Sequence, residues 1–140
     1  MKIISLFLLL VLPSNYAFSE NLSKAYFAGG CFWCMEESFE KLHGVKEVIS
    51  GYSGGTTTNP TYKEVIFGNT GHFEVVEIMF NKDIISYDEL LKNFWINIDP
   101  FDAYGQFCDK GYSYRSVAFY QSEYEKNRIE KGISEIEKKF

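Results

Sequence analysis

The sequence predicts a single-domain α+β fold in which helices pack on a mixed or antiparallel sheet. Three observations support this prediction. Apolar runs typical of strands alternate along the chain with stretches that have the spacing of amphipathic helices. Two segments begin with the Ser-x-x-Glu pattern of a helix N-terminus. Hydrophobic residues make up 46% of the chain and aromatic residues 18%, which is more apolar surface than a disordered chain leaves in water.

The first 19 residues predict a secretory signal peptide. Lys2 gives a positive start, and a short apolar block follows at residues 6–12. This block is too short to cross a bilayer comfortably, and Ala17-Phe18-Ser19 offers small residues for cleavage before Glu20. We therefore expect an exported, periplasmic protein. The alternative is a membrane anchor formed by an uncleaved signal.

The next part of the chain is predicted to form two strands around one helix. The strands are expected at residues 24–28 and 45–52, and the helix at residues 34–42. A loop rich in Gly, Ser, Thr and Asn then ends at Pro60. Because proline is common where helices begin, Tyr62 is expected in a short turn or helix start at the surface of a cleft.

Residues 72–80 predict another strand, which we expect to be buried on both faces. Glu74 shares one face of it with Val76, Ile78 and Phe80. Its carboxyl group is therefore expected inside the protein, unless it lies at the exposed end of the strand. Burial would raise the pKa of Glu74 and keep the group protonated.

The last part of the chain is predicted to contain two capped helices separated by a long loop. Ser86 opens a helix with one apolar face, and Ser122 opens a charged C-terminal helix. Residues 98–112 between them are irregular, which favours a functional loop, and a last strand is expected at residues 116–120. This order of elements predicts a ferredoxin-like α/β sandwich.

Length and charge limit the functions open to the protein. Removal of the signal leaves about 120 residues, enough for one domain with a core and too few for two. The net charge is −5, and Lys and Arg are scattered among carboxylates, so no nucleic-acid partner is expected. We expect the protein to be a monomer.

The chain has three cysteines, Cys31, Cys34 and Cys108. In an exported protein an odd number cannot all be paired in internal disulfides, so at least one thiol is free or redox-active. The density of cysteine is also lower than in small disulfide-stabilised domains. Both observations favour thiol chemistry over a structural role.

Cys31 is the best candidate for a nucleophile. It follows Gly29-Gly30 at a predicted strand-to-helix junction, where the backbone can turn sharply. Unpaired N–H groups at the start of a helix carry partial positive charge, which favours a thiolate. The alternative is that Cys31 is a small buried hydrophobic residue. Phe32 and Trp33 would line an apolar pocket beside the sulfur or belong to the core.

Six short motifs lie in order along nearly the whole mature chain. They are Gly30-Cys31-Phe32-Trp33, Gly51-Tyr52-Ser53-Gly54-Gly55, Asn59-Pro60-Thr61-Tyr62, Gly71-His72-Phe73-Glu74-Val75, Asp99-Pro100 and Asp109-Lys110-Gly111-Tyr112-Ser113-Tyr114-Arg115-Ser116. Each is weak alone, but the ordered set is highly specific. Through it, residues 20–140 resemble the methionine-S-sulfoxide reductases of the A type.

The resemblance implies an enzyme that reduces the S epimer of methionine sulfoxide, free or in oxidised proteins, to methionine. Cys31 would be the nucleophile and Glu74 the acid. Tyr62 and Tyr114 would hydrogen-bond the sulfoxide oxygen, and Asp109 would help fix the substrate or the hydrogen-bond network. A neutral carboxyl group and two phenols suit this reaction, because a sulfoxide oxygen leaves poorly until it is protonated or strongly hydrogen-bonded.

The same resemblance places Phe32 and Trp33 around the S-methyl group of the substrate. Attack by Cys31 would leave a sulfenic acid, with which a second thiol condenses to form a disulfide. Cys34 is the favoured resolving thiol because it is three residues away, and Cys108 is the competitor. No bound cofactor is expected; the reductant would be thioredoxin or, for an exported protein, a thioredoxin-like dithiol.

The sequence departs from the pattern of this family in three places. Ile98 stands where many members carry His, and Phe107-Cys108 replaces a commoner Gly-Asn pair. Many members also continue past the last helix into a tail, whereas this chain stops at Phe140, which leaves a C-terminal truncation of the domain open.

Two other functions could use the same cysteines. A thioredoxin-like disulfide oxidoreductase would also place Cys31-Phe32-Trp33-Cys34 at the start of a helix, although no suitably placed downstream proline is evident. A zinc-binding module would use both of these cysteines with His72 and Cys108 as ligands.

Overall fold

The computed structural model describes residues 20–140, so the expected signal peptide at residues 1–19 lies outside the described part of the chain. In chain order the elements are β1 (Leu22–Ala28), α1 (Phe32–Glu40), β2 (Val45–Ser53), α2 (Tyr62–Phe67), β3 (Phe73–Asn81), α3 (Tyr87–Ile96), β4 (Gly105–Gln106), β5 (Asp109–Lys110), the 3₁₀ turn η1 (Tyr112–Tyr114), β6 (Val117–Ala118) and α4 (Glu123–Lys139).

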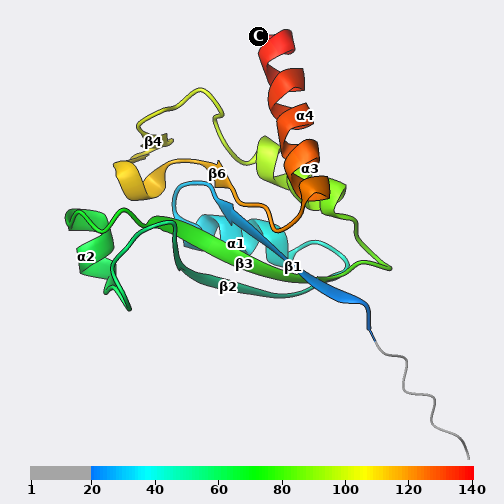
Figure 1. The fold of residues 1–140 in the computed structure, drawn as a ribbon, viewed down its shortest axis with the longest axis horizontal. Coiled ribbons are helices and arrows are strands. Elements are labelled where there is room, and N and C mark those ends of the chain that lie inside the picture. Colours follow the sequence, from blue (N-terminus) through cyan, green and yellow to red (C-terminus); the bar gives the residue numbers. More distant parts are fainter. Residues whose placement is uncertain (1–19) are drawn as a thin grey trace, which may run out of the picture.

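A four-stranded sheet in the order β2-β3-β1-β6 forms the centre of the molecule (Figure 1). All three pairs of neighbouring strands are antiparallel. The predicted α+β class is therefore confirmed, with an antiparallel rather than a mixed sheet. The sequence β1-α1-β2-β3-α3-β6 follows the β-α-β-β-α-β order of ferredoxin-like folds.

The hydrophobic core lies between the sheet and the helices α1 and α3. The ring of Phe27 on β1 is stacked 5.6 Å from that of Phe39 on α1 and 4.8 Å from that of Phe94 on α3. All three rings are essentially buried. Packing of this kind fixes where α1 begins relative to the central strands.

Strand β3 confirms the prediction for Glu74 and corrects the prediction that both of its faces are buried. Glu74 is 1% exposed and shares the core face with Val76, Ile78 and Phe80. On the opposite face Val75 is buried, but the other residues, Phe73, Glu77 and Met79, are only half-buried. The helices α1 and α3 pack on the core face, so the opposite face keeps contact with water.

The helix starts follow local capping interactions. Ser86 accepts a hydrogen bond from Glu89 N, as its Ser-x-x-Glu pattern predicts, and Thr61 caps α2 in the same way through Glu64. Helix α1 begins at Phe32, two residues earlier than expected, so Cys31 is its N-cap. The early start is possible because the N–H group of Phe32 bonds to a side chain and needs no partner within the helix.

The segment expected to be irregular contains a small hairpin that the sequence analysis missed. In it Gly105 pairs with Lys110 and Gln106 with Asp109. The last strand is also shorter than expected, since β6 has only two residues paired with β1, followed by a hydrogen bond from Phe119 N to the carbonyl oxygen of Tyr26 (3.1 Å).

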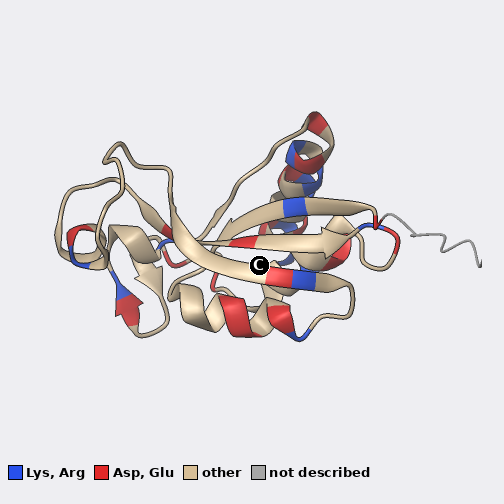
Figure 2. Cartoon of the chain, turned by 90° about the horizontal axis from the view of Figure 1, so that it is seen from below, with Lys and Arg blue, Asp and Glu red and all other residues tan. Residues whose placement is uncertain are grey.

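Charged residues of both signs are interspersed over the surface, including along α4 (Figure 2). Helix α4 begins with Glu123 and Glu125 and ends with Lys138 and Lys139, which suits the helix dipole. None of the helices in residues 20–140 combines the length and the hydropathy needed to cross a membrane.

Candidate active site

Cys31 lies at the turn that joins β1 to α1. Its carbonyl oxygen accepts hydrogen bonds from Cys34 N (3.1 Å) and Met35 N (3.2 Å), so the residue forms the first turn of α1. Gly30 before it has a φ of +89°, a conformation that favours glycine. The Cys31 side chain is half-buried, and all three cysteines are free thiols, with Cys34 and Cys108 exposed.

The carboxyl group of Glu74 lies beside this turn. Its Oε2 accepts a hydrogen bond from Phe32 N at 3.0 Å, while its Oε1 is buried and has no hydrogen-bond partner. Burial raises the pKa of Glu74; the hydrogen bond from Phe32 opposes this effect, and the charge of Asp109 adds to it. Glu74 is thus held next to the nucleophile with one oxygen available to carry a proton.

Aromatic rings surround the start of α1. The ring of Phe32 lies 5.3 Å from Trp33, 5.7 Å from Tyr52 and 6.2 Å from Tyr62, measured between centroids. Phe32 is 6% exposed and Trp33 is 62% exposed. Phe32 therefore forms a buried wall of the cluster and Trp33 an open rim.

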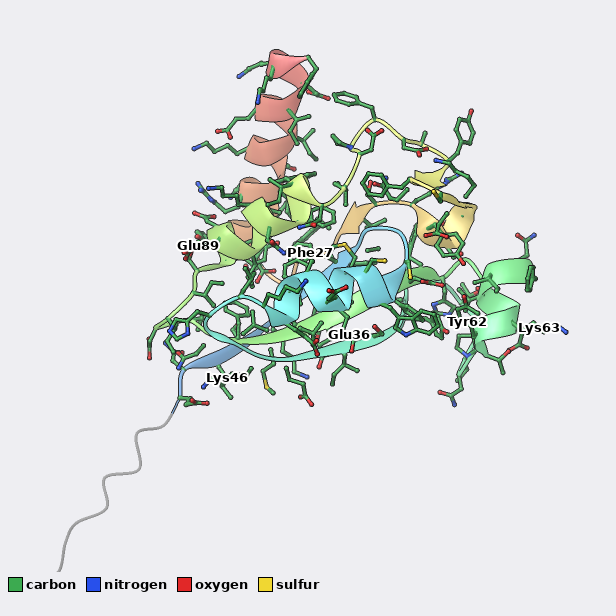
Figure 3. The ribbon with its side chains drawn as sticks, turned by 180° about the vertical axis from the view of Figure 1, so that it is seen from behind. Phe27, Glu36, Lys46, Tyr62, Lys63 and Glu89 are labelled. Carbon is green, nitrogen blue, oxygen red and sulfur yellow. The ribbon has the colours of Figure 1, made fainter. Side chains whose placement is uncertain are left out.

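The two phenols expected to act together are brought together. Tyr62 is the first residue of α2, at the end of the molecule visible in Figure 3, and Tyr114 ends η1. Burial raises the pKa of Tyr114, and a hydrogen bond with Tyr62 and the charges of Glu74, Tyr62 and Asp109 raise it further. Tyr114 therefore stays protonated at neutral pH, close to Tyr62 and to the carboxyl group.

Cys31 and Cys34 share a pocket of about 240 Å³ with Asp109. Burial raises the pKa of Cys34; the charge of Cys31, a hydrogen bond with it and the charge of Asp109 add to this effect. Cys108 lies in the exposed turn of the β4–β5 hairpin and is not among the residues that line this pocket in the described part of the chain. The geometry thus places Cys34 beside the nucleophile.

The match to known proteins agrees with this arrangement. The profile of the family described as "Peptide methionine sulfoxide reductase" matches residues 23–140. The chain belongs to this family. It is 50% identical over 118 residues to the peptide methionine sulfoxide reductase MsrA of Listeria monocytogenes serotype 4b, covering 84% of this chain and 67% of that one. A relative from Streptococcus agalactiae serotype V is 49% identical over 116 residues, or 83% of this chain and 69% of that one.

Solved structures of reductases from the family have the same fold. Methionine sulfoxide reductase A of Corynebacterium diphtheriae superposes with a TM-score of 0.75 at 31% identity, over 84% of this chain and 55% of that one. Mxr1 of Saccharomyces cerevisiae in its reduced form also gives a TM-score of 0.75, at 29% identity, over 85% and 70% of the two chains. The chain thus spans about two thirds of the curated relatives' length, and only 55% of the Corynebacterium chain.

The zinc alternative is not supported in this member of the peptide methionine sulfoxide reductase family. In residues 20–140, no group of three or more His, Cys, Asp or Glu side chains is arranged to hold a metal ion. His72 instead supports the loop before α2: its Nδ1 accepts from Gly55 N (3.2 Å) and its Nε2 donates to the carbonyl oxygen of Thr57 (2.8 Å).

The structure explains one of the positions where the sequence departs from the family pattern and leaves the other, Phe107, without an explanation. Ile98 is buried in the core, and a Cβ atom on Gly29 would lie 2.9 Å from its Cγ2 atom. Phe107, at the hairpin turn, has a φ of +49°. Arg115, the last residue but one of the last motif, lies over the ring of Tyr112, 4.9 Å from its centroid.

Two residues of this region were not predicted from the sequence. Tyr52 lies opposite Glu74 in the β2–β3 register, and burial and the charge of Glu74 raise its pKa. The pairing of its Gly-Tyr-Ser-Gly-Gly motif with β3 could have revealed it. Gln106 is buried at 1% exposure beside the pocket, and no local pattern in the sequence points to it.

Proposed function

We propose that this protein reduces the S epimer of methionine sulfoxide, free or in oxidised proteins, to methionine. One observation carries the proposal: Glu74 is buried with no hydrogen-bond partner at its Oε1, while its Oε2 accepts a hydrogen bond from the N–H group of Phe32, the residue next to Cys31. An acid kept neutral beside a thiol can protonate an oxygen while the sulfur attacks its neighbour.

The first step moves oxygen from the substrate to the enzyme. The thiolate of Cys31 attacks the sulfoxide sulfur while Glu74 protonates the sulfoxide oxygen, with Tyr62 and Tyr114 as further hydrogen-bond donors. The protonated oxygen is then passed to the Cys31 sulfur: the sulfur–oxygen bond of the substrate and the transient sulfur–sulfur bond made by the attack both break, a sulfur–oxygen bond forms on Cys31, and methionine leaves with the electron pair. Cys31 becomes a sulfenic acid, so the substrate sulfur is reduced and the cysteine sulfur is oxidised by the same two electrons.

The shape of the site supports the proposed selection of one epimer. The groups around a sulfoxide sulfur are an oxygen, a methyl group, the rest of the side chain and a lone pair. The proton donors Glu74 and Tyr114 recognise the oxygen, and the wall formed by Phe32 and Trp33 accepts the methyl group. With Cys31 approaching the sulfur from a third direction, only one configuration satisfies all contacts.

The second step forms a disulfide. The thiol of Cys34 attacks the sulfur of the Cys31 sulfenic acid, the new sulfur–sulfur bond forms and water leaves. Cys34 is favoured over Cys108 because it lies in the same pocket as Cys31. An external dithiol, thioredoxin or a thioredoxin-like protein, then returns both cysteines to thiols and is itself oxidised to a disulfide.

Export would determine which dithiol reaches the protein. A periplasmic protein meets a thioredoxin-like relay rather than cytoplasmic thioredoxin. Mass spectrometry of protein made in its own host is expected to find a chain that starts at Glu20. A chain that retains Met1 would instead support the membrane-anchored alternative.

The test is turnover with dithiothreitol as reductant and each epimer of methionine sulfoxide as substrate. We expect methionine from the S epimer alone, and none from a Cys31→Ser variant. Equal, background-level activity of the two proteins would refute the proposal. The thioredoxin-like alternative, which the Cys31–Cys34 spacing favours, requires the opposite pattern, namely reduction of insulin disulfides without turnover of either epimer.

A further inference from the structure

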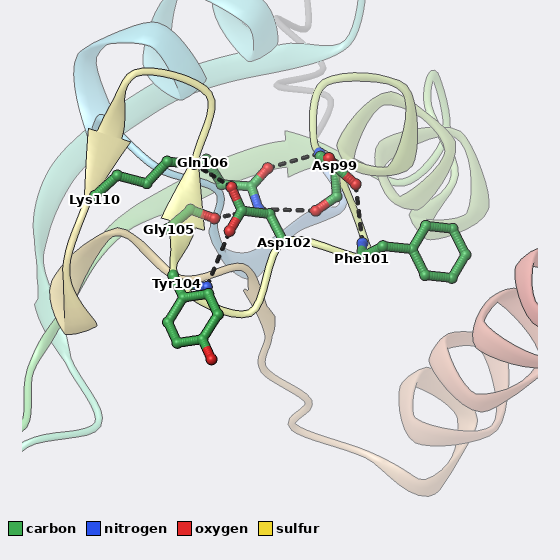
Figure 4. A network of polar contacts seen from close by, with 7 residues as sticks. All are labelled: Asp99, Phe101, Asp102, Tyr104, Gly105, Gln106 and Lys110. Atoms are coloured by element: carbon green, nitrogen blue, oxygen red, sulfur yellow. Dashed lines mark hydrogen bonds and ion pairs between the residues drawn. The ribbon is translucent and has the colours of Figure 1, made fainter.

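The side chain of Gln106, the second residue of β4, forms three hydrogen bonds with the backbone of Asp99 and Gly105 (Figure 4). Its Oε1 accepts from Asp99 N at 2.6 Å. Its Nε2 donates to the carbonyl oxygens of Asp99 at 2.9 Å and Gly105 at 2.7 Å. One buried amide therefore satisfies three backbone groups that would otherwise need other partners.

Gln106 also touches the backbone that precedes the nucleophile. A Cβ atom on Gly30 would lie only 2.8 Å from the Cβ of Gln106, so the stem of the glutamine packs directly on this glycine. In the hairpin, Gln106 pairs with Asp109. A single residue thus joins three parts of the site: the Asp99 loop, the residue before Cys31, and the strand that carries Asp109.

The other backbone bonds of the hairpin, its own short pairing and the bond from Gly111 N to the carbonyl oxygen of Tyr104 (2.8 Å), do not tie it to the Asp99 loop or to Gly30. Each of its strands has two residues, and Phe107 in its turn has a φ of +49°, which is unfavourable for a bulky side chain. The ion pair between Lys110 and Asp102 is largely on the surface, where such pairs contribute little. The position of Asp109 therefore depends on the buried amide.

We infer that Gln106 is a positioning residue, which sets the place of Asp109 relative to Cys31 and Cys34 by fastening the hairpin to Asp99 and Gly30. This inference rests on the proposed function. Gln106 does not take part in the chemistry itself. It acts through the placement of Asp109, whose charge raises the pKa of both Glu74 and Cys34.

The need for an amide leads to a specific variant, Gln106→Glu. A carboxylate keeps the acceptor for Asp99 N but turns a negative charge toward the carbonyl oxygens of Asp99 and Gly105. Protonation restores one donor. Most titratable side chains around this position are acidic. They lie at the start of α1, in the loop before β4 and on β5: Cys31, Cys34, Asp99, Asp102, Asp109 and Lys110. Burial among them would raise the pKa of the new carboxyl group.

The test measures methionine formed in a single turnover at saturating substrate, as a function of pH. At about pH 8 we expect Gln106→Glu to be slower than wild type by ~100-fold, the scale of a displacement of about 1 Å. Toward about pH 6, protonation of the new carboxyl group should bring the rate back toward that of wild type. Gln106→Ala should be slow throughout, without this recovery.

Gln121→Glu is the matched control. The Nε2 group of Gln121 also donates a hydrogen bond to a carbonyl oxygen, that of Lys24 at 2.8 Å, but Gln121 is exposed and is not among the residues that line the pocket. Its rate should follow that of wild type at every pH. A folded Gln106→Glu protein that follows wild type would overturn the inference. So would a loss of activity that only parallels loss of the native circular dichroism spectrum, because that would assign Gln106 to stability alone.

Alkylation by iodoacetamide separates this inference from the proposed function. Peptide mapping gives the rate of alkylation of Cys31 and needs no sulfoxide substrate. We expect this alkylation rate to fall in Gln106→Glu and not in Gln121→Glu. If wild type forms no methionine, the proposed function fails, and the alkylation rates still decide the inference. Unchanged alkylation of Cys31 in Gln106→Glu would then count against it.

Discussion

Glu74 is subject to two influences that act on its pKa in opposite directions. Burial favours the neutral acid, whereas the N–H group of Phe32 favours the charged form. The first effect is the larger, and Asp109 strengthens it. The result is a carboxyl group that is oriented through one oxygen, has the other oxygen free, and holds its proton to a higher pH than an ordinary glutamate, which suits protonation of a sulfoxide oxygen.

Replacement of Glu74 by Gln tests this role at the level of a single residue. The amide keeps the size of the side chain and the acceptor for Phe32 N, but it cannot release a proton to the substrate. We expect the single-turnover rate to fall by ~100-fold or more, the usual contribution of a general acid. Glu77→Gln on the opposite face of β3 is the control, since Glu77 pairs with Lys24 at 2.6 Å, away from the site.

The pH dependence of the rate gives a second check on Glu74. Because its pKa is raised, the acid should remain protonated above the ordinary glutamate value of 4.5, and the wild-type rate should decline only when the pH passes the raised pKa. Equal rates of wild type and Glu74→Gln across this range would show that the proton comes from elsewhere.

At the level of elements, a short capped helix holds one of the two phenols of the site. Helix α2 has six residues, too few to be stable alone, and Tyr62 is its first residue. Its N-terminus is held by the reciprocal bonds of Thr61 and Glu64: Glu64 N donates to Thr61 Oγ1 at 3.3 Å and Thr61 N donates to Glu64 Oε2 at 2.7 Å. Capping therefore contributes directly to the position of a site residue.

Thr61→Ala should weaken this cap by about 1 kcal/mol. If Tyr62 depends on α2 for its orientation, kcat/KM should fall by up to about fivefold, the kinetic equivalent of that free energy. Ser86→Ala removes the same kind of cap from α3, where Ser86 and Glu89 form the same pair of bonds. That variant should lose similar stability in thermal unfolding and keep its activity; a loss of activity in both would attribute the effect to stability alone.

The elements also show which parts of the structure local sequence can predict. The capped start at Ser86 and the face of β3 that carries Glu74 follow from spacing within one segment, and both predictions are confirmed. The β4–β5 hairpin could not be predicted in this way. Strands of two residues have no period to detect, and its turn has Phe107 at positive φ where glycine or asparagine would signal a turn.

At the level of the whole molecule, the site is assembled from segments that are far apart in the sequence. The bond from Phe32 N to Glu74 Oε2 spans 42 residues. The sequence motifs contain the residues of this site, but the contacts between those residues depend on the order of strands in the sheet. The free oxygen of Glu74 and the contact between Gln106 and Gly30 arise from tertiary packing, and no pattern within one segment could have predicted them.

Such a site has a measurable effect on the stability of the whole fold. A buried Glu74 whose pKa is raised stabilises the folded state fully only below the pKa of the unfolded chain, about 4.5. As the pH rises toward the raised pKa, the unfolded state loses its proton first, and the free energy of unfolding decreases. Glu77 behaves in the opposite way, because its hydrogen bonds with Lys24 and Tyr26 lower its pKa and stabilise the fold above the unfolded value.

The two glutamates of β3 should therefore give opposite results when each is replaced by Gln. At neutral pH, Glu74→Gln should raise the free energy of unfolding measured in urea. Release of the Glu74 proton favours the unfolded state of the wild type, whereas the amide has no proton to release. Glu77→Gln should lower this free energy. The difference for Glu74 should shrink as the pH falls from its raised pKa toward about 4.5, whereas the difference for Glu77 should shrink only as the pH falls below about 4.5 toward its lowered pKa. A Glu74→Gln protein that is less stable than wild type at neutral pH would contradict the assignment of Glu74 as an acid kept neutral at the expense of stability.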